Sequence, residues 1–330
     1  MRYQSVLSTA PLRISFLGGG SDIANYYEES PGAVVSAAID KYVYVHIKRH
    51  DPLFQERYRI SYSEIEYSYS RNEIRNDIVR SCLEYLDIDE PLQISTSADL
   101  PANSGLGSSS SFAVALLLGL HAMRGEEISP IQVAEEACKV EIGILKSPIG
   151  KQDQYAAAFG GLNFFNFLTS GRVNIEPLYL PNVDSGRLLE KIVLVWTGET
   201  RKANVILADQ ATRSSENFIN LRKNVELAKK FKDGLLQPEL NWETLGEMIR
   251  NGWELKKTLS PQISNEKIHS ITSSLDNSDC LGYKLLGAGG GGFVLALMNS
   301  VTPDTLNSLN KWNILRPNLD HMGARVVSLK

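Results

Sequence analysis

The sequence predicts an α+β protein of two domains, and three observations support this class. The chain has 330 residues, of which 43% are hydrophobic and 22% charged, which is enough for two medium-sized domains. In the first half, strand-like alternation precedes a glycine- and serine-rich loop and an apolar helix. The second half has the pattern of a strand, helices, a hairpin, a helix and a final strand, which indicates a sheet with helices on one face. We place the boundary in the polar segment PNVDSGR, so the predicted domains are residues 1–187 and 188–330.

The first informative segment is PLRISFLGGGSD, residues 11–22. A short strand that carries Arg13 ends there in three consecutive glycines. Such a run is tolerated where the backbone must lie against something that leaves no room for side chains. Asp22 is expected to cap the helix that follows. The alternative interpretation is an ordinary strand-to-helix turn with Asp22 as its cap.

The next elements lead up to the central motif. Residues 32–50 are predicted to form two strands joined near Asp40 and Lys41. Residues 57–69 alternate like a strand, and residues 74–86 have the spacing of a helix.

The central motif is PANSGLGSSSSFAVALLL, residues 101–118, which follows a strand-like stretch. Gly105 and Gly107 allow a tight turn, the serines add hydroxyl groups, and the helix after them presents free N–H groups, so phosphate is the expected ligand. The alternative is a flexible turn with a serine N-cap. The sequence has no Walker loop of the form GxxxxGKS/T, because Gln152 follows the only candidate glycine–lysine pair.

Two carboxylates follow this motif. Residues 131–145 have the spacing of an amphipathic helix, with Glu141 in its last turns. Pro148 and Gly150 then break the chain before Asp153 starts a helix of small residues. The two carboxylates can converge beside the phosphate loop, which suggests Mg²⁺ binding and a general base. Taken singly, Asp153 could be a helix N-cap and Glu141 part of a solvated helix face.

The second half begins with the apolar strand KIVLVWTG, which two adjacent cations, Arg201 and Lys202, follow. Helices are then predicted over residues 202–232, 242–259 and 265–276.

The last glycine-rich stretch, YKLLGAGGGGFVLALM at residues 283–298, is predicted to be a hairpin. Gly287, Gly289 and Gly292 satisfy the dinucleotide fingerprint GxGxxG. We reject that interpretation because the sequence continues as a strand where the fingerprint requires a helix. A glycine-rich hairpin pressed against a neighbouring loop or ligand is the better account.

Composition excludes several classes of protein. The formal net charge of −4 argues against binding to a nucleic-acid backbone. The 3 cysteines are far apart, without the spacing of a disulfide framework or zinc site, and a reducing cytoplasm fits them. No apolar signal core or membrane-spanning run is present, so no membrane partner is expected.

Together, the three glycine motifs resemble those of the GHMP kinases, a family named for galactokinase, homoserine kinase, mevalonate kinase and phosphomevalonate kinase. PLRISFLGGGSD is similar to their first motif, PANSGLGSSSS to the second and KLLGAGGGGF to the third. The resemblance covers nearly the whole chain. It implies a first domain like domain 2 of ribosomal protein S5, a ferredoxin-like second domain, and ATP and Mg²⁺ as cofactors.

The resemblance also implies roles for particular residues. Asp153 would accept or orient the proton of the attacking hydroxyl, and Arg13 would neutralise charge on the transferred phosphoryl group and help fix Asp153. Glu141 with Ser108 or Ser109 would hold Mg²⁺. The ATP-binding residues would be Pro101, Gly105, Leu106, Gly107, Ser108, Ser109 and Ser110.

The predicted substrate-binding residues come from three parts of the chain. Sugar hydroxyls would meet the first glycine motif, the third motif would close over the site, and cations would hold a substrate phosphate. These residues are Gly19, Gly20, Ser21, Asp22, Gly289, Gly290, Gly291, Lys151, Arg201 and Lys202. For the cations, ordinary solvated surface charge is an equal alternative.

Within the family, the GGGSD form of the first motif and the segment PIGKQDQYAAAFGG are most similar to the D-glycero-D-manno-heptose 7-phosphate kinases, with the fucokinases next. The expected reaction is phosphorylation of the anomeric hydroxyl of that sugar phosphate, to supply a nucleotide-activated heptose for a surface glycan. The alternatives are a kinase of an unphosphorylated sugar such as L-fucose, a non-catalytic sugar and ATP sensor, and, more weakly, a decarboxylating relative. The oligomeric state stays open, a homodimer being one option.

Overall fold

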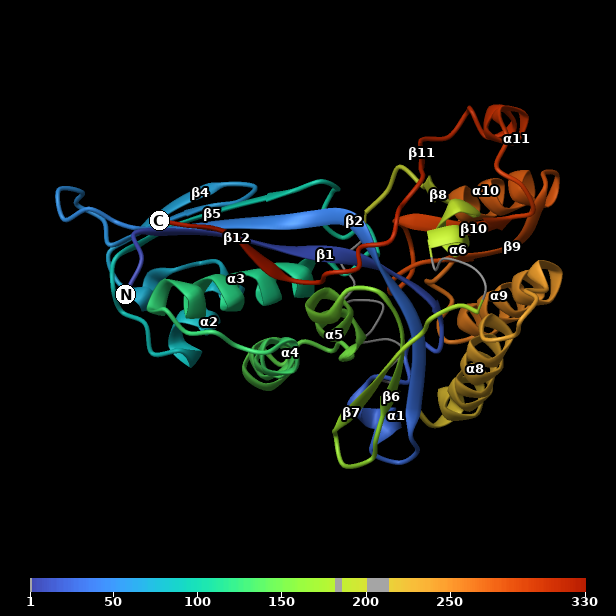
Figure 1. Cartoon of the computed structure of the whole chain (residues 1–330), viewed down its shortest axis with the longest axis horizontal. Helices are drawn as coiled ribbons and strands as arrows, with labels where there is room; N and C mark the ends of the chain where they lie inside the picture. The colour runs from blue at the N-terminus through green and yellow to red at the C-terminus, as the bar shows by residue number, and fades with distance from the viewer. Residues whose placement is uncertain (1, 182–185, 201–213) are drawn as a thin grey trace.

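The fold consists of two β-sheets with their helices, side by side along the long axis of the molecule (Figure 1). The computed structural model describes residues 2–181, 186–200 and 214–330. One sheet has 8 strands and the other has 4. Both helices and strands are abundant in each half, which confirms the predicted α+β class. None of the helices in the described part of the chain combines the length and apolarity that a membrane span requires.

The first sheet has the order β12-β1-β2-β5-β3-β4, and β6 and β7 extend it from β2. All neighbouring strands are antiparallel except β3 and β5, which are parallel. Its strands are β1 (Ser5–Leu17), β2 (Gly32–Arg49), β3 (Tyr58–Ser61), β4 (Ile65–Ser68), β5 (Leu92–Ala98), β6 (Leu162–Phe167), β7 (Val173–Pro177) and β12 (Arg325–Leu329).

The long strand β2 corrects one prediction. The sequence predicted two strands joined near Asp40, but β2 is continuous over 18 residues and changes its partner instead. Its first part pairs with β6, and its later part pairs with β5. The partner strand β1 absorbs the bend through a register shift between Pro11 and Leu12. The chain therefore bends at a bulge, where the sequence had predicted a turn between two strands.

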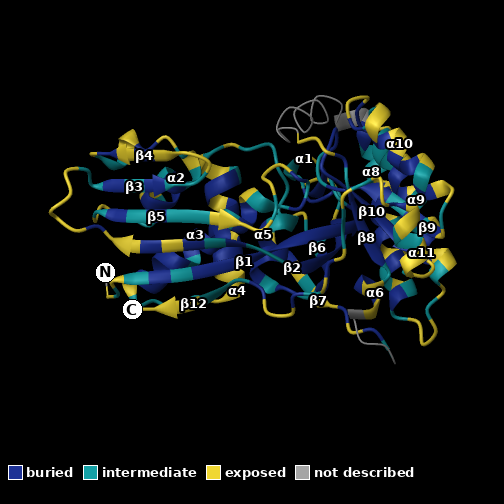
Figure 2. Cartoon of the chain, turned by 90° about the horizontal axis from the view of Figure 1, so that it is seen from above, coloured by how far each residue is buried: buried dark blue, intermediate teal, exposed yellow. Residues whose placement is uncertain are grey.

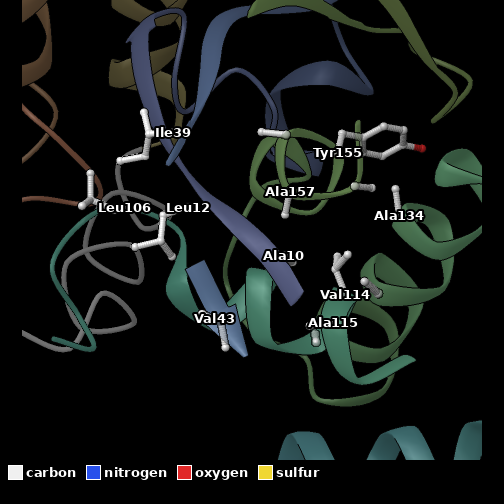
Figure 3. Packing of buried hydrophobic residues seen from close by; sticks show 14 of the residues in the cluster. Ala10, Leu12, Ile39, Val43, Leu106, Val114, Ala115, Ala134, Tyr155 and Ala157 are labelled. Carbon is white, nitrogen blue, oxygen red and sulfur yellow. The ribbon is translucent and has the colours of Figure 1, made fainter. Parts of the chain in front are cut away.

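Helices cover one face of the first sheet, as Figure 1 shows. Helix α3 packs on β1 and β2, where the small side chains of Ala10 and Ala115 let the elements approach closely and Leu12 and Val43 fill the space beside them (Figure 3). Ser8 Oγ also donates a hydrogen bond to the carbonyl of Ala115 at 2.7 Å. The helices of this half are α1 (Ala24–Tyr27), η1 (Arg71–Glu73), α2 (Asp77–Tyr85), α3 (Ser108–Arg124), α4 (Pro130–Cys138), η2 (Lys139–Ile144) and α5 (Gln152–Phe159).

The second sheet is antiparallel, in the order β11-β8-β10-β9. Helices α9 and α10 pack on it around a core that includes Trp253, Ile271 and Val294. Buried residues are also concentrated where β1 and β2 approach this sheet (Figure 2). The elements of this half are α6 (Gly186–Glu190), β8 (Ile192–Trp196), α8 (Ser214–Leu235), α9 (Trp242–Lys257), α10 (Glu266–Asp276), β9 (Cys280–Leu285), β10 (Phe293–Met298), α11 (Pro303–Ser308) and β11 (Ile314–Leu315).

The C-terminal segment returns to the first sheet. The final strand was predicted as part of the second half, but β12 pairs with β1, so its placement there is corrected. Asp320 anchors this return by accepting hydrogen bonds from Tyr42 Oη at 2.8 Å and from the amide of Gly323 at 2.7 Å. The boundary between residues 187 and 188 stays a proposal, and we propose that residues 325–329 belong structurally to the first domain.

A buried histidine joins α3 to α4. His121 Nδ1 lies 2.6 Å from Glu126 Oε2, and His121 Nε2 lies 2.8 Å from Glu136 Oε2. Burial lowers the pKa of His121, but the hydrogen bonds to Glu136 and Glu126 outweigh it, and the net pKa is raised. The two carboxylates favour the protonated form of His121, and this cluster ties the end of α3 to the helix that leads to Glu141.

We expect His121→Gln to destabilise the protein more at pH 5.5 than at pH 8.5, by on the order of 1 kcal/mol. Because the folded-state pKa of His121 is raised, its contribution is present in full below the unfolded pKa and is lost as the pH rises through the folded value. Urea unfolding at both pH values measures this. His269→Gln, at an exposed position, is the control. An equal loss of unfolding free energy at both pH values would refute the ion-pair role.

Candidate active site

A cavity of about 600 Å³ lies between the two halves. Its walls come from the end of β1 and the turn after it, from the loop between β5 and α3, from η2 and the start of α5, and from α8, α9 and the residues after β9. Segments far apart in the sequence thus meet there. Among the predicted site residues, those that line the cavity are Arg13, Gly19, Gly20, Asp22, Gly105, Gly107, Ser108, Ser109, Ser110, Glu141 and Asp153.

The phosphate loop is the glycine- and serine-rich segment between β5 and the first turn of α3. It has the predicted order of strand, loop and helix. Gly105 and Gly107 adopt φ values of +83° and +79°, a backbone conformation that favours glycine. The N-cap of α3 is Gly107, without a side-chain cap, so the serine N-cap expected as an alternative is wrong. The first turn of α3 therefore faces the cavity with its helix N-terminus uncapped, an arrangement suited to an anion.

Arg13 and Asp153 form a paired unit in the cavity. Arg13 Nε donates to Asp153 Oδ1 at 2.7 Å, and Arg13 Nη2 donates to Asp153 Oδ2 at 2.8 Å. Arg13 Nη1 also donates to the carbonyl of Gly105 at 2.7 Å, so one guanidinium links the carboxylate to the phosphate loop. A Cβ atom on Gly107 would lie 3.2 Å from Asp153 Oδ2, which shows how closely this loop passes the carboxylate. The arginine thus fixes Asp153 in direction and keeps it beside the loop.

Glu141 belongs to η2, a π-helical segment that continues α4 where an α-helix was predicted to run on. Its Oε1 accepts from Ser109 Oγ at 2.9 Å, and its Oε2 accepts from Gln154 Nε2 at 2.7 Å. Burial raises the pKa of Glu141, although hydrogen bonds from Ser110, Gln154 and Ser109 oppose this shift. The carboxylate is therefore buried, oriented and turned toward the phosphate loop.

These residues fit an Mg²⁺ ion. Mg²⁺ binds through one or two carboxylates together with substrate phosphates and waters, so a dedicated cage of side chains is unnecessary. Among the described residues there is no group of three or more His, Cys, Asp or Glu side chains that could hold a metal ion. Glu141 and Ser109 Oγ, which are hydrogen-bonded to each other at 2.9 Å, could supply oxygen ligands beside the loop, and Ser108 lines the same cavity.

Asp22 has a different role from the predicted helix cap. Helix α1 has Ile23 as its N-cap, without a side-chain hydrogen bond. The Asp22 carboxylate instead accepts hydrogen bonds from the amides of Gly20 at 2.9 Å and Gln152 at 3.1 Å, and from Gln152 Nε2 at 3.0 Å. Burial raises the pKa of Asp22, and the charge of Asp153 raises it further. A Cβ atom on Gly150 would lie 1.9 Å from Asp22 Oδ2, so only glycine fits there.

Several predicted residues lie away from the cavity wall. Ser21 is buried, and its hydroxyl donates to the carbonyl of Gly18 at 2.7 Å, so it stabilises the turn itself. Lys151 Nζ donates to the carbonyl of Gly171 at 2.6 Å and lies over the Tyr27 ring. Predicted residues that are absent from the lining, as the described part of the chain outlines it, are Pro101, Leu106, Lys151, Ser21, Gly289, Gly290 and Gly291. Arg201 and Lys202 lie outside the described residues.

The third glycine motif is the predicted hairpin between β9 and β10. Added Cβ atoms would lie 2.5 Å from the Cα of Gly105 at Gly287, and 2.4 Å from the carbonyl oxygen of Ser104 at Gly292. The hairpin therefore presses against the phosphate loop, as the sequence suggested. Gly287 and Ala288 reach the cavity.

Sequence reasoning missed several polar side chains in the cavity wall, among them Ser15, Gln152, Asn224, Lys256 and Lys284. Ser15 Oγ and Gln152 Oε1 are buried atoms without a hydrogen-bond partner among the described residues, so both can serve a bound molecule. Asn224 of α8 accepts from the amide of Gly18 at 3.2 Å, which ties the glycine turn to the second half. Lys256 and Lys284 also line the cavity. Usable signals existed for Lys284, a lysine in an apolar strand, and for Ser15 and Gln152, which lie inside the quoted motif segments, whereas Asn224 and Lys256 lie outside any motif.

This arrangement of three glycine-rich segments around a carboxylate defines a kinase of the GHMP family. Residues 75–161 match the family model "GHMP kinases N terminal domain", and residues 231–306 match "GHMP kinases C terminal". A D-glycero-alpha-D-manno-heptose 7-phosphate kinase from Campylobacter jejuni is 32% identical over 307 residues, which cover 88% of each protein. The chain therefore belongs to the GHMP kinase family.

Other similar sequences and structures also come from GHMP kinases. A mevalonate kinase from Methanothermobacter thermautotrophicus is 26% identical, over 73% of this chain and 76% of that protein. A solved structure of a D-glycero-D-manno-heptose 1-phosphate kinase from Bacteroides thetaiotaomicron superimposes with a TM-score of 0.79 at 23% identity, over 98% of this chain and 99% of that chain. A Lactococcus lactis galactokinase structure gives 0.76 at 15% identity, over 98% of this chain and 95% of that chain. These structures establish the two-domain GHMP kinase fold.

Proposed function

We propose that this protein transfers the terminal phosphoryl group of ATP to the anomeric hydroxyl of D-glycero-D-manno-heptose 7-phosphate. The observation that carries the proposal is the Arg13–Asp153 pair, which lies between the phosphate loop and the glycine turn that holds Asp22. In this proposal, the pair would present the Asp153 carboxylate to both the acceptor hydroxyl and the phosphoryl group. The choice of sugar follows the 32% identity to the Campylobacter jejuni enzyme.

Each part of the cavity would then have a role. The loop from Gly105 to Ser110 would hold the ATP phosphates, and Glu141 with Ser109 would bind Mg²⁺, which offsets phosphate charge. Asp153 would accept the proton of the attacking hydroxyl. Phosphoryl transfer requires mainly positioning and electrostatic stabilisation, so these few groups suffice.

Arg13 would act in two ways. Its bidentate contact orients Asp153, and its contact with the Gly105 carbonyl holds the loop beside that carboxylate. The same guanidinium would stabilise charge that develops on the phosphoryl group in transit. Asp22, with the turn at Gly19 and Gly20, would bind sugar hydroxyls, because its carboxylate and the amides around it form a buried polar wall.

A second candidate is a kinase of an unphosphorylated sugar. A bifunctional fucokinase/GDP-fucose pyrophosphorylase from Arabidopsis thaliana is 27% identical over 87% of this chain and 29% of that protein. Lys151, one of the cations predicted for the substrate phosphate, is also turned away from the cavity. This observation favours an acceptor without a phosphate. Kinetics with both kinds of acceptor distinguish the two candidates.

A panel of acceptors tests the proposal. Turnover of ATP is measured with D-glycero-D-manno-heptose 7-phosphate, the same heptose without its phosphate, L-fucose and D-galactose. We expect kcat/KM for the heptose 7-phosphate to exceed the others by about 10²-fold or more, because a paired phosphate is a strong recognition element. A higher kcat/KM for L-fucose would overturn the substrate assignment, and turnover of none of the sugars would favour a sensor.

A further inference from the structure

Two lysines of the second half line the cavity and hold strand ends. Lys284, in β9, is buried, and its Nζ donates to the carbonyls of Ser15 at 3.0 Å and Phe16 at 2.6 Å. These carbonyls lie at the end of β1, just before the first glycine turn. The ammonium of Lys284 therefore joins the second sheet to the strand that carries Arg13.

Lys256, near the end of α9, binds backbone carbonyls at the start of the third glycine motif. Its Nζ donates to the carbonyl of Leu285 at 2.8 Å and to that of Gly287, where the hairpin loop begins. Both lysines thus lie at the start of a glycine-rich segment and face the same cavity. Lys284 opens the third motif, KLLGAGGGGF, but the sequence predicted no role for either lysine.

Neither lysine has an anionic partner. In residues 2–181, 186–200 and 214–330 no carboxylate lies within ion-pair distance of Lys256 or Lys284. Arg13, the third cation of the cavity, is already neutralised by Asp153. A buried positive charge without a counter-ion is costly, so a bound anion would relieve both groups.

Each ammonium also has an unused donor. A protonated lysine has three N–H groups, and two of them bind backbone carbonyls in each case. The remaining donor of each is free for a ligand in the cavity. Two cationic donors that line one cavity, one from α9 and one from β9, form a subsite that fits phosphate oxygens.

We propose that Lys256 and Lys284 form a phosphate-binding subsite on the wall of the cavity that the second half supplies. The anion is a phosphate group, either the terminal phosphate of ATP or the acceptor's own phosphate. The second source rests on the proposed function, whereas the first requires only that the protein binds ATP. Lys284 also bridges the halves, because it joins β9 to the end of β1, whereas Lys256 joins α9 to the hairpin within the second half.

The test uses Lys256→Gln and Lys284→Gln in the full-length protein. Glutamine removes the charge but keeps an amide donor for the carbonyls, and thermal unfolding checks that each variant is folded. The control is Lys257→Gln, at the neighbouring lysine, which pairs with Glu254 at 2.8 Å and lies outside the cavity lining. ATP binding is measured by calorimetry, and KM and kcat are measured with heptose 7-phosphate and with the unphosphorylated heptose.

The two sources give different results. If the acceptor's phosphate occupies the subsite, KM for heptose 7-phosphate rises about 10- to 100-fold while KM for the unphosphorylated heptose and ATP affinity stay unchanged. If the ATP phosphate occupies it, ATP affinity or kcat falls by a similar factor with both acceptors. The control variant should match the wild type in every measurement.

Proton uptake provides a readout that a merely structural lysine would not change. Burial and, to a smaller extent, the charge of Arg13 together lower the pKa of Lys284 to about 7. The charged groups that face Lys284 in the described chain, Arg13 of β1 and Lys256 of α9, are both cations. A phosphate beside it should restore its proton, so at pH 8 the wild type should take up more protons on ligand binding than Lys284→Gln does. Calorimetry in two buffers of different ionisation enthalpy measures this.

The subsite is refuted if folded Lys256→Gln and Lys284→Gln variants match the wild type in ATP affinity, KM, kcat and proton uptake. The proposed function would survive that result, since the wild type could still prefer heptose 7-phosphate. Conversely, a wild-type enzyme that prefers L-fucose would refute heptose 7-phosphate as the substrate. The calorimetric measurements of ATP binding would still test the subsite.

Discussion

Asp153→Asn is expected to lower kcat by about 10²- to 10⁴-fold while ATP still binds with an affinity near that of the wild type. Asparagine has the shape of aspartate but cannot accept the proton of the attacking hydroxyl. It also removes the charge that Arg13 binds at 2.7 Å, so the guanidinium loses its ionic partner. Steady-state kinetics with the acceptor panel and calorimetric titration of ATP measure the two effects separately.

Asp276→Asn is a matched control for this variant. Asp276 also pairs with an arginine, Arg250, at 2.6 Å, but it lies on α10 outside the cavity lining. Its replacement should leave kcat unchanged, and both variants should be compared by thermal unfolding. If folded Asp153→Asn kept the turnover of the wild type, Asp153 would not be a catalytic residue. A loss of ATP affinity as large as the loss of kcat would assign it to nucleotide binding instead.

Glu141→Gln is expected to raise the Mg²⁺ concentration needed for half-maximal activity by at least about 10-fold. The amide is nearly the same size as the carboxylate and can still accept from Ser109, but it lacks the negative charge that holds the ion. Activity measured across a titration of MgCl₂ at saturating ATP reports this shift. At low Mg²⁺ the loss of kcat/KM should be largest, and excess Mg²⁺ should restore part of it.

The control for Glu141→Gln is Glu135→Gln, which changes an exposed carboxylate on the preceding helix α4. It should leave the Mg²⁺ requirement as it is in the wild type. An identical Mg²⁺ titration curve for Glu141→Gln and the wild type would mean that Glu141 only packs against Ser109 and Gln154.

Local sequence signals were sufficient where backbone geometry depends on neighbouring residues. The order of strand, loop and helix around Gly105 and Gly107, the hairpin at the third motif and the helix that Asp153 begins were all predicted correctly. Glycine at positive φ, apolar periodicity and chain breaks are properties of a few consecutive residues, so they can be read without the fold.

Signals that depend on distant partners were misread. Asp22 looked like a helix cap, but its carboxylate binds the amide of Gln152, 130 positions away in the chain. A turn was predicted near Asp40, but β2 is continuous there, because a bulge in β1 and a change of partner accommodate the bend. The last strand looked like part of the second sheet until its pairing with β1 was known.

The sequence by itself determined the family, and it predicted the phosphate loop and the two carboxylates, Glu141 and Asp153, because each is carried by a short motif with its own chemistry. Only the tertiary structure decided which groups share the cavity. It brought Arg13 to Asp153, chose Ser109 as the partner of Glu141, turned Lys151 away and brought in Lys256 and Lys284. The physical reason is that side-chain contacts depend on long-range strand pairing and helix packing, which place residues from both halves of the chain on one wall.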